Sequence, residues 1–99
     1  MIVHVALFKW KSGVTSEQVA DTLKKVQKLK SKVDGLKDIF VGENFHKESK
    51  GFTHGVVVVA ENQEALDTYR KHPDHTVVAN LIEQMEEDGI GFDFKNLEK

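Results

Sequence analysis

The sequence predicts an α+β fold of the ferredoxin-like kind, in which the elements follow the order β-α-β-β-α-β and the strands form an antiparallel sheet. The order of the elements predicts it, since segments with strand and helix patterns follow one another along the chain in this order. The two strongest strand segments are apolar on both of their faces, which bears on how the sheet is covered. The length of 99 residues fits one domain, so residues 1–99 are expected to form a single unit.

Four segments are rich in β-branched and aromatic residues and lie between turn-forming residues, which is typical of strands. The turn Lys11-Ser12-Gly13 ends the first segment, and a polar loop over residues 46–51 separates the second from the third. The predicted strands are Ile2–Trp10, Leu36–Phe45, Phe52–Ala60 and Ile90–Phe94.

The first helix is predicted between two clear signals. Thr15 and Gln18 have the spacing of a capping box, in which the two side chains bond to each other's backbone N–H groups. Apolar residues then recur at helical spacing until Asp34-Gly35 ends the helix.

The second helical region is predicted to contain a break. Asn62 is the expected N-cap of a helix that carries Leu66 and Tyr69 on its apolar side. Pro73 interrupts this helix, because proline disfavours helical geometry in the residue before it and suits the first position of a new helix. A further helix is therefore expected over residues 73–87.

The strand Ile2–Trp10 has apolar residues on both faces, and so does Phe52–Ala60, which predicts a sheet covered on both sides. The helices can cover only one side, because crossovers of one hand place them on the same face. A second copy of the chain is the expected cover of the other side. His4 and His54 share their strand positions with large apolar residues, so we expect them on the dimer-facing surface, lining a pocket between the two sheets.

The charge pattern argues against a nucleic-acid or membrane partner. The formal net charge is −2 with the histidines neutral, and positive and negative side chains are mixed along the chain. The one local excess of lysines, over residues 24–32, lies among acidic residues and is typical of a solvated helix face. The apolar N-terminal segment is too short to span a membrane and lacks the features of a signal peptide, so we expect a cytoplasmic protein.

No metal or cofactor is expected. His72-x-x-His75 has a possible ligand spacing, but the proline between the two histidines works against a shared helical face. Gly89-Ile-Gly91 is not followed by a predicted helix, so it does not form a nucleotide-binding loop. Because the chain has no cysteine, disulfides and thiol catalysis are excluded.

Four short motifs identify a family that the chain resembles. They are Ile2-x-His4-x-x-Leu7-Phe8-Lys9, Gly51-Phe-Thr-His54-Gly, Leu66-x-x-Tyr69-x-x-His72-Pro73-x-His75 and Asp93-Phe94. Over residues 2–94 these motifs resemble the stress-responsive dimeric α/β-barrel (Dabb) family, and the Tyr-x-x-His-Pro-x-His run is the most specific of them. The resemblance implies a ferredoxin-like protomer and a homodimeric α/β barrel.

The resemblance also implies roles for particular residues. The family includes plant stress proteins and a plant polyketide cyclase that closes a ring by an intramolecular aldol condensation with loss of water. By this resemblance His75 corresponds to the general base and Tyr69 to the phenol that polarises the substrate carbonyl. His4 and His54 match polar positions lining the same pocket. The expected substrate-binding residues are His4, Phe8, His54, Val56 and His72.

Elementary chemistry supports these roles and leaves a structural alternative for each. An imidazole titrates near neutral pH and can accept and return a proton, and a tyrosine hydroxyl can stabilise a developing enolate. As alternatives, His75 and Tyr69 are buried core residues, and His4 and His54 are hydrogen-bonded interior groups. His72 would then stabilise the backbone at the helix break.

Three functions follow from these observations. The first is a homodimeric barrel that binds an apolar, carbonyl-bearing small molecule. The second is an acid–base enzyme of the cyclase, isomerase or lyase kind that acts at carbon next to a carbonyl. The third is a structural stress protein without turnover, so the sequence leaves open whether the protein is an enzyme.

Overall fold

The structure is a computed structural model that describes residues 1–97. Its elements follow the predicted order, with the second helical region divided in two, which confirms the ferredoxin-like fold. The elements are β1 (Ile2–Trp10), α1 (Ser16–Lys28) with a short 3₁₀ turn (Leu29–Ser31), β2 (Leu36–Glu43), β3 (His54–Ala60), α2 (Gln63–Lys71), α3 (Pro73–Met85) and β4 (Glu86–Lys95).

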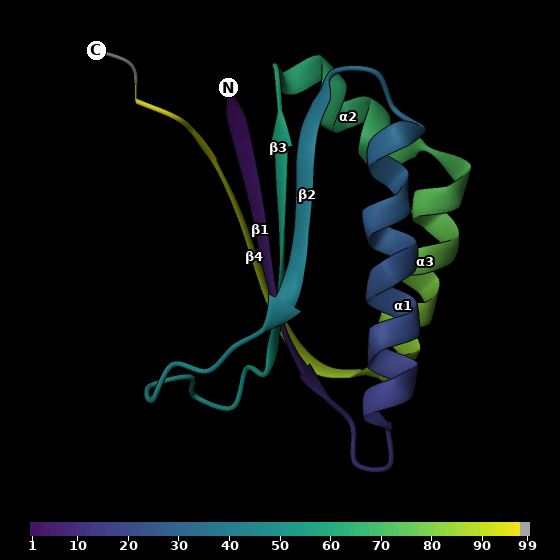
Figure 1. Ribbon diagram of the computed structural model, residues 1–99, viewed down its shortest axis with the longest axis vertical. Coiled ribbons are helices and arrows are strands. Elements are labelled where there is room, and N and C mark those ends of the chain that lie inside the picture. Colours follow the sequence, from purple (N-terminus) through teal and green to yellow (C-terminus); the bar gives the residue numbers. More distant parts are fainter. Residues whose placement is uncertain (98–99) are drawn as a thin grey trace.

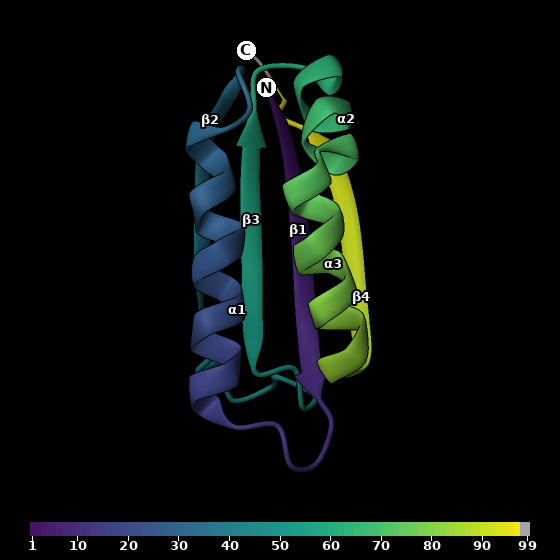
Figure 2. The same cartoon turned by 90° about the vertical axis from the view of Figure 1, so that its right-hand side faces the viewer.

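The four strands form one antiparallel sheet in the order β2-β3-β1-β4. All three helices lie on one face of this sheet, so the molecule has two layers (Figure 1). Seen from the helix side, α1 lies over β2 and β3, while α2 and α3 lie over β1 and β4 (Figure 2). The other face of the sheet has no cover within residues 1–97.

The core fills the space between the sheet and the helices. Leu29, Ile39, Leu66 and Val58 are the largest side chains with almost no exposed surface, and they come from both layers. Burying such apolar side chains stabilises the fold by about 1.5–3 kcal/mol each. The core therefore fixes the helices over the sheet, to which β2 and β3 contribute Ile39 and Val58.

The predicted helix signals are present. The Thr15 hydroxyl accepts a hydrogen bond from the Gln18 backbone N–H, and the Gln18 side chain accepts one from the Thr15 N–H, which completes the capping box. The Asn62 side chain accepts from the Ala65 N–H and caps α2. These caps satisfy N–H groups that have no partner inside a helix.

The strand boundaries differ from the expected ones, most clearly where α3 meets β4. The helix ends at Met85, and β4 begins at Glu86 instead of Ile90. Three acidic residues follow Met85, and negative charge is unfavourable at the C-terminus of a helix. Pairing of Glu86 with Trp10 in the sheet also recruits this segment into β4. At the other edge β2 stops at Glu43 and β3 starts at His54, so the loop between them, residues 44–53, is longer than predicted.

The two strand histidines lie on the opposite face of the sheet from the one predicted. Residues opposite one another in the sheet point to the same side, and His4 pairs with Val58, which belongs to the buried core under the helices. His54 lies on this same side, two residues before Val56 and four before Val58. Both histidines therefore face the helices and not the open side, so the expected dimer-facing position of His4 and His54 is wrong.

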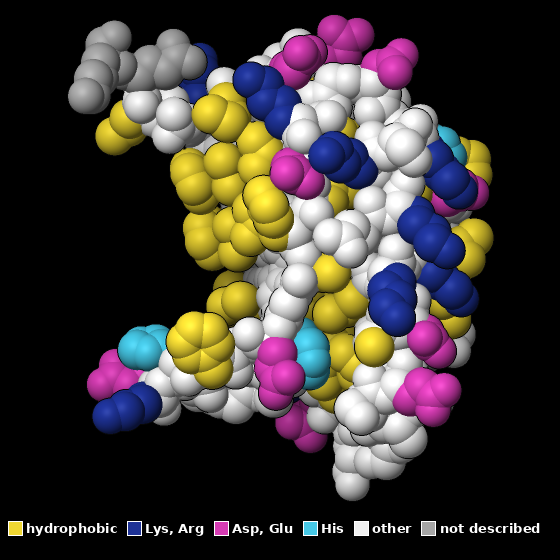
Figure 3. Space-filling view, in the orientation of Figure 1, with side chains coloured by type: hydrophobic (Ala, Val, Ile, Leu, Met, Phe, Trp, Pro, Cys, Tyr) yellow, Lys and Arg dark blue, Asp and Glu magenta, His cyan; other side chains and the backbone are white. Residues whose placement is uncertain are grey.

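The open face carries the residues of the other parity. Phe40, Ile90, Phe92 and Phe94 lie on it, each about half exposed, together with Val3, Val5, Leu7, Val57 and Val59. Figure 3 shows apolar side chains gathered on the side of the sheet away from the helices, above the projecting 44–53 loop. We call this set of residues the open apolar face. Among residues 1–97, no helix is both long and apolar enough to cross a membrane.

Candidate functional site

A cavity of about 220 Å³ lies between the sheet and the helices. It is lined mostly by apolar side chains, and four of the residues expected at the site are among them. The lining residues are Phe8, Val26, Val56, Tyr69, His75, Val78, Ala79, Ile82 and Glu86. Larger hollows of about 510 and 450 Å³ lie near Asn62, and most of the residues that line each of them are polar or charged. We take the smaller cavity as the candidate site, because it combines apolar walls with the converging Tyr69 and His75, and a few convergent polar groups in apolar walls are typical of ligand pockets.

Tyr69 and His75 meet at one end of this cavity. Tyr69 lies in the last turn of α2 and His75 in the first turn of α3, on either side of the break at Pro73. Their rings pack edge to face with centroids 4.6 Å apart. The break lets both side chains reach the same space, which a continuous helix would not allow for residues six positions apart.

The Tyr69 hydroxyl has no hydrogen-bond partner within residues 1–97, although the residue is only 3% exposed. It is not sealed from solvent either, since no buried side-chain polar atom in these residues is left unsatisfied. The hydroxyl therefore opens onto the cavity. Burial raises the pKa of Tyr69 to about 12, against the opposing effect of Arg70, so the phenol keeps its proton at neutral pH and can donate it to a ligand.

The electrostatic surroundings keep His75 neutral. Burial lowers its pKa below the ordinary 6.5, and the nearby His4 and Arg70 lower it further by charge repulsion. A hydrogen bond to the Arg70 backbone acts in the opposite direction but is outweighed. A neutral imidazole can accept a proton, so this position meets the first requirement for a general base.

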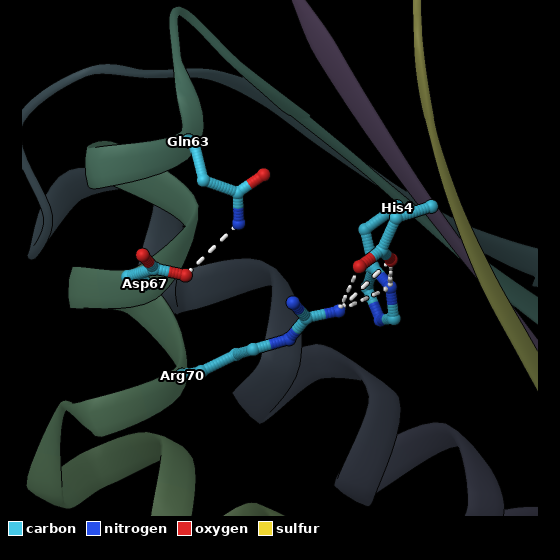
Figure 4. Close-up of polar contacts among 5 residues, drawn as sticks. His4, Gln63, Asp67 and Arg70 are labelled. Atoms are coloured by element: carbon cyan, nitrogen blue, oxygen red, sulfur yellow. Dashed lines mark hydrogen bonds and ion pairs between the residues drawn. The ribbon is translucent and has the colours of Figure 1, made fainter.

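His4 belongs to a polar group beside the cavity and is not part of its lining. Its Nδ1 lies 2.6 Å from the Asp93 carboxylate on the neighbouring strand β4. The Arg70 guanidinium extends from α2 to both, donating to Asp93 at 2.6 and 2.8 Å and lying 3.2 Å from His4 Nδ1 (Figure 4). The shorter contact indicates that Nδ1 carries a proton bonded to Asp93, because arginine cannot accept a hydrogen bond. Burial works to raise the pKa of Asp93, but its bonds to Arg70 and His4 outweigh this and lower it.

His54 lies outside the cavity lining, next to Trp10. The Trp10 indole donates a hydrogen bond to His54 Nδ1 at 2.9 Å, and the Thr53 hydroxyl is at the same distance from that atom. Because an indole N–H can only donate, Nδ1 is unprotonated and the proton of the neutral ring sits on Nε2. Burial lowers the pKa of His54, against a weaker opposing effect of Glu43.

His72 has a capping position at the helix break. Its Nδ1 accepts a hydrogen bond from the Asp74 backbone N–H at 3.0 Å, which makes it the N-cap of α3. Its side chain does not line the cavity. This geometry is the one that the structural alternative for His72 predicts.

Glu86, Arg70 and Trp10 are polar residues of the site region that the sequence analysis did not select. The apolar periodicity predicts that Glu86 belongs to a helix, whereas the acidic residues after Met85 are the signal that the helix ends there. Arg70 was one of many basic residues on a helix, and nothing in the sequence shows that it reaches Asp93. Within residues 1–97, no group of three or more histidine and acidic side chains is arranged to hold a metal ion.

Together, the fold and the cavity define a ferredoxin-like protein with a small, mostly apolar ligand site whose polar groups are a phenol, an imidazole and a carboxylate. The model of the stress-responsive A/B barrel domain family matches residues 2–96, so the chain belongs to this family, as the motifs indicated.

Relatives of the chain include an enzyme and a stress-response protein. Olivetolic acid cyclase from Cannabis sativa is 26% identical over 95 residues, covering 94% of each chain. The stress-response A/B barrel domain-containing protein HS1 from Arabidopsis thaliana is 28% identical over 83 residues, covering 82% of this chain and 76% of the relative. A dimeric ferredoxin-like protein from Thermobifida fusca is 28% identical, with a TM-score of 0.83 over 94% of this chain and 88% of its own.

Proposed function

We propose that the chain forms a homodimer in which each protomer binds a small carbonyl compound in the cavity beside Tyr69 and His75. The Tyr69 hydroxyl carries the proposal, because it is a proton donor at the wall of an apolar cavity and has no hydrogen-bond partner within residues 1–97. A carbonyl oxygen is an acceptor only, so it complements this donor. The volume of about 220 Å³ lies below the roughly 300–1,000 Å³ of typical ligand pockets, which favours a small ligand.

The homodimer is supported by the open apolar face. Its half-exposed phenylalanines form a contiguous patch, and such patches on a soluble protein mark interaction sites. A second copy complements the face by symmetry, and the dimeric state described for the Thermobifida fusca protein is in keeping with this.

A second candidate function is acid–base catalysis in the same cavity. The neutral His75 would take a proton from carbon next to the ligand carbonyl, and the electron pair of that C–H bond would move to the carbonyl oxygen, held by the Tyr69 hydroxyl. The enolate carbon would then attack a second carbonyl of the same molecule, forming a C–C bond while the C=O π pair becomes an alkoxide that takes the proton back from His75. Loss of this hydroxyl together with a second hydrogen from the attacking carbon would then release water and leave a C=C bond. The contact between the two rings and the cyclase relative support this candidate.

Native mass spectrometry of the freshly purified protein tests the proposal, with denaturing analysis of anything released. We expect a dimer that carries a small molecule with a carbonyl group. An empty dimer, or an assembly larger than a dimer with no ligand, would favour a structural stress protein. A monomer at micromolar concentration would overturn the proposed homodimer.

A further inference from the structure

Glu86 gives the cavity a second polar end. It is the first residue of β4 and directly follows α3, whereas His75 lies in the first turn of that helix. A rise of 1.5 Å per residue separates the two positions by roughly 16 Å along the helix axis. Both residues line the cavity, and the wall that α3 contributes between them is apolar, from Val78 to Ile82.

The Glu86 carboxylate has no hydrogen bond or ion pair with the part of the chain that the structure describes. Its Oε2 lies over Gly89, where an added Cβ would come within 2.6 Å of it. Gly89 does not have a left-handed backbone, so its local geometry does not require glycine. The missing side chain instead leaves the space that the carboxylate occupies at the cavity wall.

No basic side chain forms an ion pair with Glu86 within residues 1–97, although Lys11 lies close by in the chain path, with its backbone N–H bonded to the Met85 carbonyl. Glu87 and Asp88 follow it in β4, and within residues 1–97 neither of them forms an ion pair. A purely apolar ligand in this cavity would remove water from the Glu86 carboxylate without forming a hydrogen bond to it, which is unfavourable. A cation would replace that water with a charge-assisted hydrogen bond.

We propose that the ligand of this cavity is a small carbonyl compound that carries a protonated amine at the end remote from the carbonyl. This inference rests on the proposed function, since Tyr69 and His75 are taken to bind the carbonyl end. Glu86 is then a specificity-determining residue, and the apolar wall along α3 contacts the hydrocarbon spacer between the two polar groups. The ligand class is thus amphiphilic and cationic, where the sequence predicted an apolar one.

A series of synthetic ketones with spacers of increasing length tests the inference. The cationic probes are ω-(dimethylamino)alkan-2-ones with four to seven methylenes between carbonyl and nitrogen, such as 8-(dimethylamino)octan-2-one. Each has a neutral partner of the same shape in which CH replaces the protonated nitrogen, such as 9-methyldecan-2-one. Binding is measured at pH 7 by ¹H–¹⁵N chemical-shift titration of the wild-type protein, Glu86→Gln and the matched control Glu87→Gln, which changes an exposed carboxylate outside the cavity.

At the best spacer length, we expect the wild type to bind the cationic probe about 3- to 10-fold more tightly than its neutral partner, as for a partly solvated charge-assisted bond. This preference should vanish in Glu86→Gln and persist in Glu87→Gln. Intermolecular NOEs in the wild type should connect the N-methyl groups with Gly89 and Ile82, and the acetyl methyl group with Tyr69.

The other outcomes separate the two proposals. Equal binding of both probe types by the wild type would overturn the cationic ligand and leave the carbonyl site in place. An equal loss of preference in both variants would overturn the role of Glu86, because a general negative field would then explain the effect. If no ketone of the series changes the NMR chemical shifts of any cavity residue in the folded protein, both the proposed function and this inference fail.

Discussion

The rings of Tyr69 and His75 meet edge to face with centroids 4.6 Å apart, across a break between two helices. Pro73 creates this break, and the His72 imidazole stabilises it by capping α3 through the Asp74 backbone N–H. The backbone at the break thus determines how the two site residues approach each other. The Tyr-x-x-His-Pro-x-His motif therefore specifies a geometry as well as a pair of functional groups.

Removing the Tyr69 hydroxyl should affect binding more than stability. Tyr69→Phe keeps the ring contacts, and the hydroxyl has no partner within residues 1–97, so we expect the free energy of unfolding to change by less than about 1 kcal/mol. Affinity for 9-methyldecan-2-one should fall about 3- to 10-fold, the value of one neutral hydrogen bond. Urea unfolding and NMR titration measure the two quantities. A loss of several kcal/mol in stability would instead make the hydroxyl structural.

Acidification should destabilise the protein near pH 6. The pKa values of His75 and His54 are lowered below the ordinary 6.5 by burial, so between 6.5 and these lower values the unfolded chain binds more protons than the folded one. The free energy of unfolding should therefore decrease as the pH falls below about 6.5, and the loss should be complete once the pH is below both folded-state values. The lowered pKa values of Asp74 and Asp93 act in a separate window below about pH 4.

Urea unfolding between pH 7.5 and 5 measures this dependence. His75→Asn should flatten it, because one of the two histidines with a lowered pKa is removed. The exposed His46 provides the control, since His46→Asn should leave the slope as in the wild type. A slope that is unchanged in His75→Asn would contradict the buried, neutral state of this imidazole.

The order of the elements and the helix caps could be predicted because they depend on local signals. Thr15, Gln18 and Asn62 act within one turn of the chain, and Pro73 constrains its own neighbours. The boundary at Glu86 could not be obtained from apolar periodicity, because it depends on sheet pairing with Trp10.

The face on which the histidines lie could not be predicted from the same pattern. A period of two separates the residues of a strand into two sets but does not say which set the helices cover. In β1 both sets are apolar, so hydrophobicity does not decide between them. The contacts of His4 with Arg70 and Asp93 do decide, but these residues are 66 and 89 positions away in the sequence.

Trp10 should control the protonation of His54. Its indole N–H bonds to the unprotonated Nδ1, and this contact favours the neutral ring. Trp10→Phe removes the donor and keeps an aromatic ring, so we expect the pKa of His54 to rise while that of His75 stays as in the wild type. Two-dimensional ¹H–¹⁵N NMR of the imidazole rings measures both pKa values and should show the Nε2–H form of His54 in the wild type. An Nδ1–H form there would contradict the hydrogen bond from Trp10.

Charge on the open apolar face should dissociate the proposed homodimer. Ile90 is 48% exposed on this face, on the edge strand β4, where it pairs with Leu7 and lies two residues before Phe92. Ile90→Lys would bury an ammonium group without a partner in a dimer, which is strongly unfavourable, while in the monomer the lysine remains solvated. We expect the dimer dissociation constant to rise by at least about 30-fold, the effect of burying an unpaired charge in an interface.

Sedimentation equilibrium of the wild type and two lysine variants measures this effect. The matched control is Val77→Lys, because Val77 is also β-branched and 58% exposed but lies on α3, in the other layer of the molecule. This control should remain dimeric, and both variants should keep the wild-type fold by circular dichroism. Dissociation by Val77→Lys alone would place the interface on the helix layer. A wild-type dimer that tolerates Ile90→Lys unchanged would show that the half-exposed phenylalanines of the sheet do not hold the two copies together.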